Sequence, residues 1–411
     1  MKRLSLLLLP ALLFGTDLKT LLEVAPKNNN LIRAAKITQQ SKIKELQSAK
    51  SNYYPTLDTN LFYQREDAPT PFYPGTTYGA TAKINFDIYD GGQKSYTKRA
   101  KENELNAATH SYKADQNALA LAITKEFFNL RSLYASLNAR EEASTAVKAQ
   151  LNRMQQFYAA NLATSDDVDR LQSAYDRNIY AIESLKFKIF SLKSQLELQV
   201  GIKISKLEPS HFQKSLQTKS QLLDAIKTIH YNKLALKNLS ETIDSYYYPN
   251  IKLQDKFTLY GYEDKPFFAG RPIELLDHQN TIMATLSLRL FDFNRLAEKK
   301  EALQLKADAL NEKLLYKTKE QKMQLDLAKR GIQTAQLNIK SSQSALKAAK
   351  SALKTITKKY EAGIADNVSY LDALSSKTEA KALYEKSRND LEIAYAIFYY
   401  YNAKNLEEYL K

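Results

Sequence analysis

The sequence predicts a mainly α-helical protein with a small β part, built as an internal duplication. Two long stretches are nearly free of the residues that interrupt helices. Residues 93–200 contain no Gly and no Pro, and residues 294–411 contain only Gly331 and Gly363. Both stretches can therefore run as very long helices.

The second stretch repeats the first at a constant offset of 202 residues. Matching positions are Tyr89 and Phe291, Asp90 and Asp292, and Tyr158 and Tyr360. Such a duplication sets the number of structural units, so it must be recognised before a fold is assigned. We expect two repeats, at 16–200 and 220–411, joined by a linker at 201–219.

Residues 1–15 have the pattern of a secretory signal peptide. Lys2 and Arg3 are followed by an apolar run, Leu4–Phe14, and by the small residue Gly15. A membrane anchor is the weaker interpretation, because a helix that spans a bilayer needs about 18 apolar residues. No later segment has the composition of a transmembrane helix, so any membrane-spanning part should consist of strands.

Each repeat contains a predicted β-hairpin, at 56–89 and at 250–291. Residues 80–88 and, apart from Met283, residues 282–290 alternate between apolar and polar side chains, which indicates strands. The helix at 18–51 precedes the first hairpin and ends shortly before a proline.

Each β-hairpin leads into a predicted long helical hairpin, at 92–200 or at 294–411. Apolar residues recur at the a and d positions of heptads in the first long helix, which indicates a coiled-coil seam. At about 1.5 Å per residue, the part that ends near Asn161 should extend roughly 100 Å. The returning helix covers about half of that length, so the helix at 18–51 should cover the rest.

The composition argues against an enzyme and against a nucleic-acid partner. The formal net charge is +15, but the lysines are spread along helices among Glu and Asp, without a compact basic patch that holds base-stacking aromatics. The chain has no Cys and only four scattered His, so no disulfide, metal or cofactor is expected. No phosphate-binding loop or nucleophile–base pair is present.

Several motifs relate the chain to a known family. The first β-hairpin ends in Ile88-Tyr89-Asp90-Gly91-Gly92, and the second long helix ends in Tyr360-Glu361-Ala362-Gly363, which leads to Tyr370-Leu371-Asp372. The first repeat has the related segments 158–161 and 166–168. With these motifs in register, nearly the whole mature chain resembles the TolC family of outer-membrane efflux proteins.

The resemblance implies a homotrimer in the outer membrane of a Gram-negative bacterium. Each chain would contribute four strands to a twelve-stranded transmembrane β-barrel, and its helical hairpins to an α-barrel that forms a tunnel across the periplasm. The trimer would be the passive exit duct of a tripartite efflux pump or type I secretion system, exporting small molecules or polypeptides. Its partners would be a periplasmic adaptor (membrane fusion protein) and an inner-membrane transporter.

Physical chemistry supports the same assembly. Four strands cannot close a barrel, and open sheet edges are not tolerated against lipid, so several chains must combine. Three copies would supply about twelve strands, enough to enclose a channel. The apolar strand face would then contact outer-membrane lipid.

Strand alternation assigns the polar side chains to the channel lumen. The charged residues expected there are Lys83, Asp87, Lys252, Lys256 and Arg289. Asp255 is expected to face outward or sideways. Basic residues then outnumber acidic ones, so the lumen should favour anions.

The two turns at the tunnel tip are the docking sites for the adaptor that the resemblance implies. They comprise Asn161, Leu162, Ala163, Thr164 and Ser165 in the first repeat, and Gly363, Ile364, Ala365, Asp366 and Asn367 in the second. Small residues there should let another helical hairpin approach closely. Ser165 or Asp166 can cap the returning helix, and Gly363 can also be an ordinary helix C-cap.

The resemblance further implies a periplasmic gate formed by acidic residues just after the turns. The matching positions are Asp372 and Asp167, and a ring of like charges from three copies would attract cations. Ser369 and Ala365 stand where family members often have an acidic and a basic residue that hold this gate closed. Either Tyr360 and Asp166 substitute for them, or the resting gate is looser than in relatives that have these bonds. Alternatively, the three aspartates only cap helices or stabilise their N-termini.

Two other functions remain open from sequence alone: a periplasmic coiled-coil adaptor and a structural tether. An adaptor would have one helical hairpin flanked by small Gly-rich β-domains, whereas this chain has two hairpins and only 10 Gly. A tether would lack the alternating strands.

Overall fold

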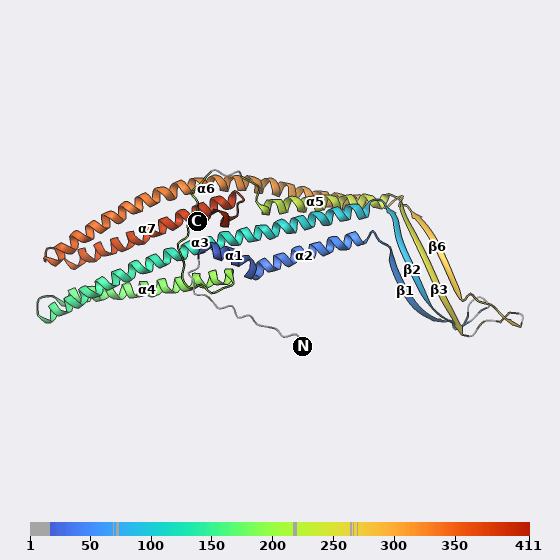
Figure 1. Ribbon diagram of the computed structural model, residues 1–411, viewed down its shortest axis with the longest axis horizontal. Coiled ribbons are helices and arrows are strands. Elements are labelled where there is room, and N and C mark those ends of the chain that lie inside the picture. The colour runs from blue at the N-terminus through green and yellow to red at the C-terminus, as the bar shows by residue number, and fades with distance from the viewer. Residues whose placement is uncertain are drawn as a thin grey trace. The chain divides into compact units, whose positions relative to one another are not determined.

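The computed structural model describes residues 17–68, 70, 74–216, 220–263, 265, 267–268 and 270–411 (Figure 1). The expected signal peptide at 1–15 lies outside these residues. The chain forms two compact units, each of which takes segments from both repeats. We call them the helical unit (Met1–Lys36, Ser111–Ala225 and Lys317–Lys411) and the sheet unit (Ile37–His110 and Ile226–Tyr316). The duplication therefore does not produce two separate compact domains.

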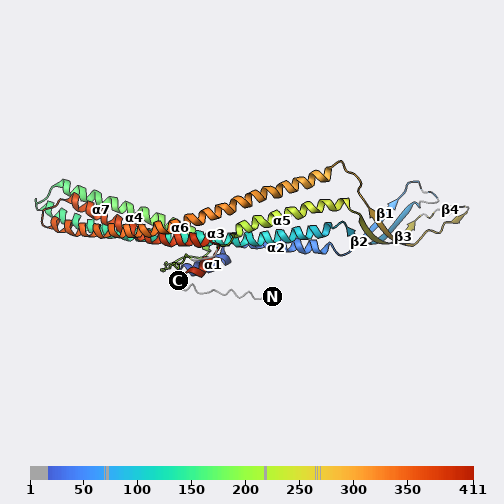
Figure 2. The ribbon, with the colours of Figure 1, turned by 90° about the horizontal axis from the view of Figure 1, so that it is seen from above.

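The helical unit consists of two helical hairpins and a short N-terminal helix. Its elements are α1 (Leu18–Asn28), α4 (Ser165–Val200), α7 (Asn367–Tyr401), the 3-10 helix η2 (Leu406–Tyr409) and the C-terminal parts of α3 (Gln93–Ala159) and α6 (Arg295–Glu361). Helix α4 runs back along α3, and α7 runs back along α6 (Figure 2). No helix among the described residues combines the length and apolar character needed to cross a membrane.

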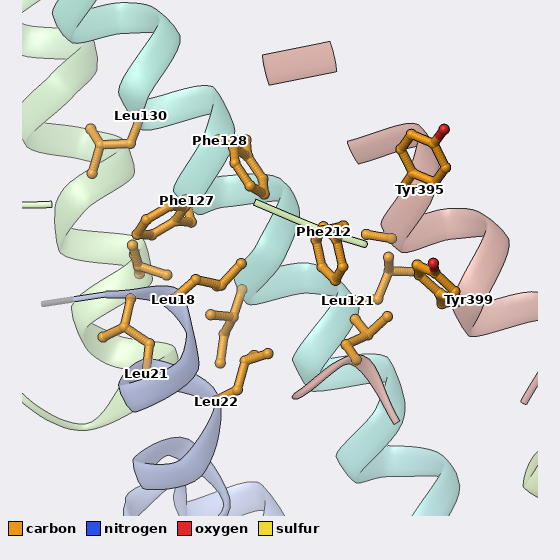
Figure 3. Packing of buried hydrophobic residues seen from close by; sticks show 14 of the residues in the cluster. Leu18, Leu21, Leu22, Leu121, Phe127, Phe128, Leu130, Phe212, Tyr395 and Tyr399 are labelled. Atoms are coloured by element: carbon orange, nitrogen blue, oxygen red, sulfur yellow. The ribbon is translucent and has the colours of Figure 1, made fainter. Parts of the chain in front are cut away.

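A hydrophobic cluster joins these hairpins to α1 and to the linker that follows α4 (Figure 3). Phe127 and Phe128 of α3 are fully buried in it, together with Phe212 of the linker and Tyr399 of α7. The Tyr399 hydroxyl donates a hydrogen bond to the Gln213 carbonyl at 2.6 Å. Burial of each large apolar side chain contributes roughly 1.5–3 kcal/mol, so the linker is held against the helices by packing as well as by hydrogen bonds.

The helix expected at 18–51 is broken, which corrects the prediction of one continuous element. Helix α1 ends at Asn28, and α2 (Asn30–Ser51) begins after Asn29. The Asn29 side-chain oxygen accepts from the backbone N–H groups of Leu31 at 2.9 Å and Ile32 at 3.1 Å, while its amide donates to the Gln199 carbonyl at 2.8 Å. The break thus depends on a contact with α4, which is distant in sequence.

The sheet unit contains an antiparallel sheet in the order β1-β2-β3-β6. Its strands are β1 (Thr56–Arg65), β2 (Thr76–Asp90), β3 (Asn250–Glu263) and β6 (His278–Ser287), and a second, small sheet pairs β4 (Phe267–Phe268) with β5 (Arg271–Pro272). The unit also holds α5 (Asp224–Asp244), which the 3-10 helix η1 (Ser245–Tyr247) extends. The two expected hairpins are therefore neighbours in one sheet.

The turn between β2 and α3 requires glycine. Gly91 has a φ of +67°, and a Cβ there would lie 2.4 Å from the Ser245 carbonyl oxygen. At the equivalent turn of the second repeat, Phe293 and Asn294 adopt the same left-handed conformation, with φ of 55° and 63°. The duplication has preserved this backbone geometry although the glycines have been replaced.

Candidate functional site

The two turns that join α3 to α4 and α6 to α7 share one backbone motif. Asn161 and Gly363, which are equivalent in the two repeats, have φ of 58° and 72°. The next residue in each turn, Leu162 or Ile364, donates its N–H to a carbonyl of the preceding helix at 2.8 Å. Left-handed C-caps therefore account for both turns, including the glycine.

The residues that begin the returning helices differ from those expected. Thr164, rather than Ser165 or Asp166, is the N-cap of α4, and it forms a reciprocal capping box with Asp167. In the second repeat, Asp366 caps α7 by accepting the backbone N–H of Ser369 at 2.9 Å. Threonine is also an N-cap residue. The spacing of Thr164 and Asp167, three residues apart, fits a capping box and could have been recognised in the sequence.

A chain of hydrogen bonds connects the two turns. The Tyr360 hydroxyl donates to the Asn367 side-chain oxygen, and the Asn367 amide donates to Asp167 at 3.0 Å. Asp167 also accepts from the Thr164 hydroxyl at 2.8 Å. Asn367 is only 5% exposed, so it is a buried bridge and not the exposed docking residue that was expected.

The surroundings shift the pKa values of two members of this chain. The hydrogen bond from Thr164 is the main cause that lowers the pKa of the Asp167 carboxyl, and the bond from Asn367 adds to it. Burial raises the pKa of the Tyr360 hydroxyl. Both shifts favour the protonation states that these hydrogen bonds require: a charged Asp167 carboxylate that accepts and a neutral Tyr360 hydroxyl that donates.

The other residues of the expected gate lie apart from this network. Asp166 pairs with Arg170 of its own helix at 2.8 Å, so it does not substitute for a missing closing bond near Tyr360. Asp372 lies on the wall of a hollow of about 340 Å³ that Arg140 and Arg177 also line. Its acidic charge is therefore not isolated from basic groups.

The turns expose large apolar side chains as well as small ones. Leu162 and Ile364, at equivalent positions of the two repeats, are each 75% exposed. The sequence interpretation stressed the small residues and overlooked this matched pair, which the repeat offset would have revealed. Because both turns carry the same side-chain type, they present two similar apolar contacts.

The strand register places most of the expected lumen residues on one face of the sheet. Lys83 lies opposite Lys256, and Asp87 lies opposite Lys252, with Nζ of Lys252 3.9 Å from the Asp87 carboxylate. Directly paired residues of antiparallel strands share a face. Asp58 lies opposite Lys83 and joins this polar face, although the sequence interpretation did not include it.

Arg289 does not follow the predicted alternation. Strand β6 ends at Ser287, so Arg289 lies beyond it, with its guanidinium carbon 5.7 Å from the ring centre of Tyr246. Asp255 pairs with Ile84 and Ile282, which places it on the apolar face as expected. One face thus holds the charged pairs, and the other is mostly apolar.

Comparisons with known proteins agree with this architecture. Residues 21–182 match the family described as outer membrane efflux protein, whereas no curated protein matches the sequence. A membrane protein from Pseudomonas aeruginosa has a similar structure, with 16% identity and a TM-score of 0.81 over 94% of this chain and 93% of that one. The Campylobacter jejuni CmeC outer membrane channel is 14% identical in sequence, with a TM-score of 0.84 over 94% of this chain and 85% of that one. The Vibrio cholerae outer membrane protein VceC is 16% identical, with a TM-score of 0.77 over 95% of this chain and 96% of that one.

The similarity to the family of outer membrane efflux proteins covers residues 21–182, and the chain shares the fold of the solved outer-membrane channels. The resemblance to the TolC family, made from motifs in both repeats, is confirmed.

The capping network should make the start of α4 sensitive to acid. Because the folded-state pKa of Asp167 lies below its ordinary value of 3.8, its stabilising effect is present above that value and is lost as the pH falls through the folded-state pKa. We expect the first-turn amides of α4 to lose hydrogen-exchange protection, after correction for intrinsic rates, between about pH 5 and 3. Asp167→Asn should remove this response, whereas Asp169→Asn, at an exposed position of the same helix, should retain it. An unchanged response in Asp167→Asn would assign the effect to another group.

Proposed function

We propose that this protein is the exit duct of a tripartite efflux or type I secretion system and that it works as a homotrimer. The carrying observation is the four-stranded sheet, whose mostly apolar face is exposed and whose outer strands β1 and β6 have free edges in the chain. Leu61 and Ile282 on that face are 87% and 70% exposed. Three copies joined edge to edge would satisfy the strand backbones and turn this face toward lipid.

The repeats at 16–200 and 220–411, with the linker between them, fit this proposal. Their helical hairpins would line a tunnel, and energy for export would come from an inner-membrane transporter connected through a periplasmic adaptor. The sequence contains no motif that would couple transport to a chemical reaction, which agrees with a passive role.

Ion selectivity of the reconstituted trimer tests the channel and its lumen together. Per chain, the polar sheet face carries three lysines, Lys83, Lys252 and Lys256, against Asp58 and Asp87. We expect conducting trimers in planar bilayers with a modest preference for anions. Lys83→Glu combined with Lys256→Glu should reverse the preference. Lys19→Glu with Lys50→Glu, which makes the same charge change in exposed helical positions, should leave it unaltered.

A trimer that does not conduct would contradict the channel function. A conducting trimer whose selectivity ignores the first double variant would instead place the selective region outside the sheet.

We also propose that the tip turns, 161–165 and 363–366, dock the adaptor. The two exposed apolar side chains at equivalent positions, Leu162 and Ile364, would provide the contacts, and the small residues beside them would allow close approach. Substitution of Gly363 is a poor test, because its positive φ strains any other residue even though the space around it is open.

Removing both apolar contacts should weaken docking without unfolding the turns. Leu162→Ser with Ile364→Ser should reduce co-purification of the adaptor and abolish export, while the amount of trimer in the membrane stays constant. Leu315→Ser with Leu383→Ser, which removes two exposed leucines away from the turns, is the control for lost apolar surface. Full export by the turn variant would remove these side chains from the docking site.

We further propose that the tip contains the gate. The hydrogen bonds from Tyr360 through Asn367 to Asp167 would hold the two turns of a subunit together in the closed state. Ser369 adds a backbone contact to Asp366, and Asp372 of three copies would present a ring of carboxylates.

The concentration of a multivalent cation that blocks the channel tests whether Asp372 forms that ring. Hexaamminecobalt(III) added from the tip side should block the native channel, and Asp372→Asn should require a severalfold higher concentration. Asp390→Asn, further along α7, should have no such effect. Equal block of the native and Asp372→Asn channels would place the cation site elsewhere.

A further inference from the structure

Exposed charges of opposite sign repeat along α4 and along α6 in the helical unit. On α4, Asp169, Asp176 and Glu183 follow one another every seven residues and lie on the side away from the buried residues Leu171 and Ile182. A spacing of seven residues keeps side chains on one face of a helix over two turns.

The row on α6 has the opposite sign. Lys340, Lys347 and Lys354 repeat at the same spacing, and Lys358 completes the row; all are exposed. Residues 327–360 of α6 contain no Asp or Glu, and these four lysines form no ion pair with another residue that the structure describes. Lys354 and Lys358 are four residues apart and repel each other, whereas the other lysines lie two turns, about 10 Å, apart, where salt screens much of the repulsion. The row therefore offers exposed positive charge to a partner.

We propose that the α6 row of each subunit pairs with the α4 row of the neighbouring copy of this chain, forming the seam of the tunnel. The proposal rests on the trimeric channel function and specifies which surfaces meet. The two rows belong to different helices, so their contact is heterologous, and a heterologous contact gives a ring when the rotation between copies closes, as three copies would require here. A second copy is favoured over another protein because the charges, the heights and the apolar neighbours of the rows all match.

The heights match because the Asn367–Asp167 hydrogen bond holds the two turns level. Helix α4 begins at Ser165, and Asp176 follows after about three helical turns. Helix α6 ends at Glu361, and Lys354 and Lys347 precede that end by about two and four turns. In a ring whose axis runs along the helices, each acidic side chain therefore falls between two lysines. Asp169 and Glu183 occupy corresponding gaps.

Apolar side chains continue the match beyond the charges. Phe190 and Leu198 of α4 are 69% and 79% exposed, and they follow the start of the helix by about seven and nine turns. Leu337 and Leu327 of α6 are also exposed, and they precede the end of that helix by about seven and nine turns. Beside the lysines, α6 exposes Ser and Ala, which leave room for Tyr180 of α4.

Cross-linking of the full chain tests the seam. Because the sequence contains no Cys, only the introduced thiols can react. Asp176→Cys with Ser351→Cys puts two thiols on the facing surfaces at nearly equal height. A short bismaleimide should link the native-size trimer into covalent dimers and trimers. Asp176→Cys with Gln333→Cys keeps the thiols on the same faces but separates them by about 25 Å along the axis. This variant should therefore give no covalent dimers or trimers and run as single chains on a denaturing gel.

Charge reversal provides the second measurement. Lys347→Glu with Lys354→Glu should abolish the heat-resistant trimer band in detergent gels, and adding Asp176→Lys should partly restore it. Lys359→Glu, on another face of α6, should leave the band unaltered.

The outcomes separate this inference from the channel function. The seam is contradicted, and the channel function is not, if a conducting trimer shows no cross-link between the matched thiols. The same holds if Lys347→Glu with Lys354→Glu leaves the heat-resistant trimer band unchanged. Linked trimers that do not conduct support the seam and overturn the channel function.

Discussion

For the membrane channel that we propose, the governing constraint is that strand backbones in lipid must find hydrogen-bond partners. The sheet has two outer strands, β1 and β6, and one mostly apolar face, so a single chain can neither hide its edges nor bury that face. In the proposed trimer, closure by further copies would remove both problems at once. The long helices would share this dependence, because they continue from the strands and each copy would bring its own helices into the ring.

Within the helical unit, local capping and long-range contacts support each other. Thr164 and Asp366 begin the returning helices, and the same carboxylate that completes the first capping box also accepts a hydrogen bond from the other repeat. Asn367 is suited to the bridge because its amide offers both an acceptor and donors. Each hydrogen bond of this network is worth about 1 kcal/mol, so in the gate that we propose a few such bonds would hold the closed arrangement and modest forces from a partner would open it.

Charge is arranged differently in the two units. On the sheet, lysines and aspartates face one another across strands, and Lys83 lies directly opposite Lys256, which is unfavourable unless water or anions separate them. On the helices, acidic and basic rows lie on separate elements; the lysines of the α6 row form no ion pair with another described residue, whereas Glu183 of the α4 row pairs with Lys186 of its own helix at 2.8 Å. In the proposed trimer, part of the net charge of +15 would lie on assembly surfaces and in a solvated lumen.

Local patterns in the sequence determined the duplication, the long helices and the four main strands, because the absence of Gly and Pro and the periods of two and seven act over short distances. Strand alternation also separated Lys83 and Asp87 from the apolar face. Tertiary structure decided the break at Asn29, the end of β6 before Arg289, the addition of Asp58 to the polar face and the role of Asn367. Each of these depends on a partner far away in the chain, such as Gln199 for Asn29 and Asp167 for Asn367, and no local period encodes which distant residue packing will bring into contact.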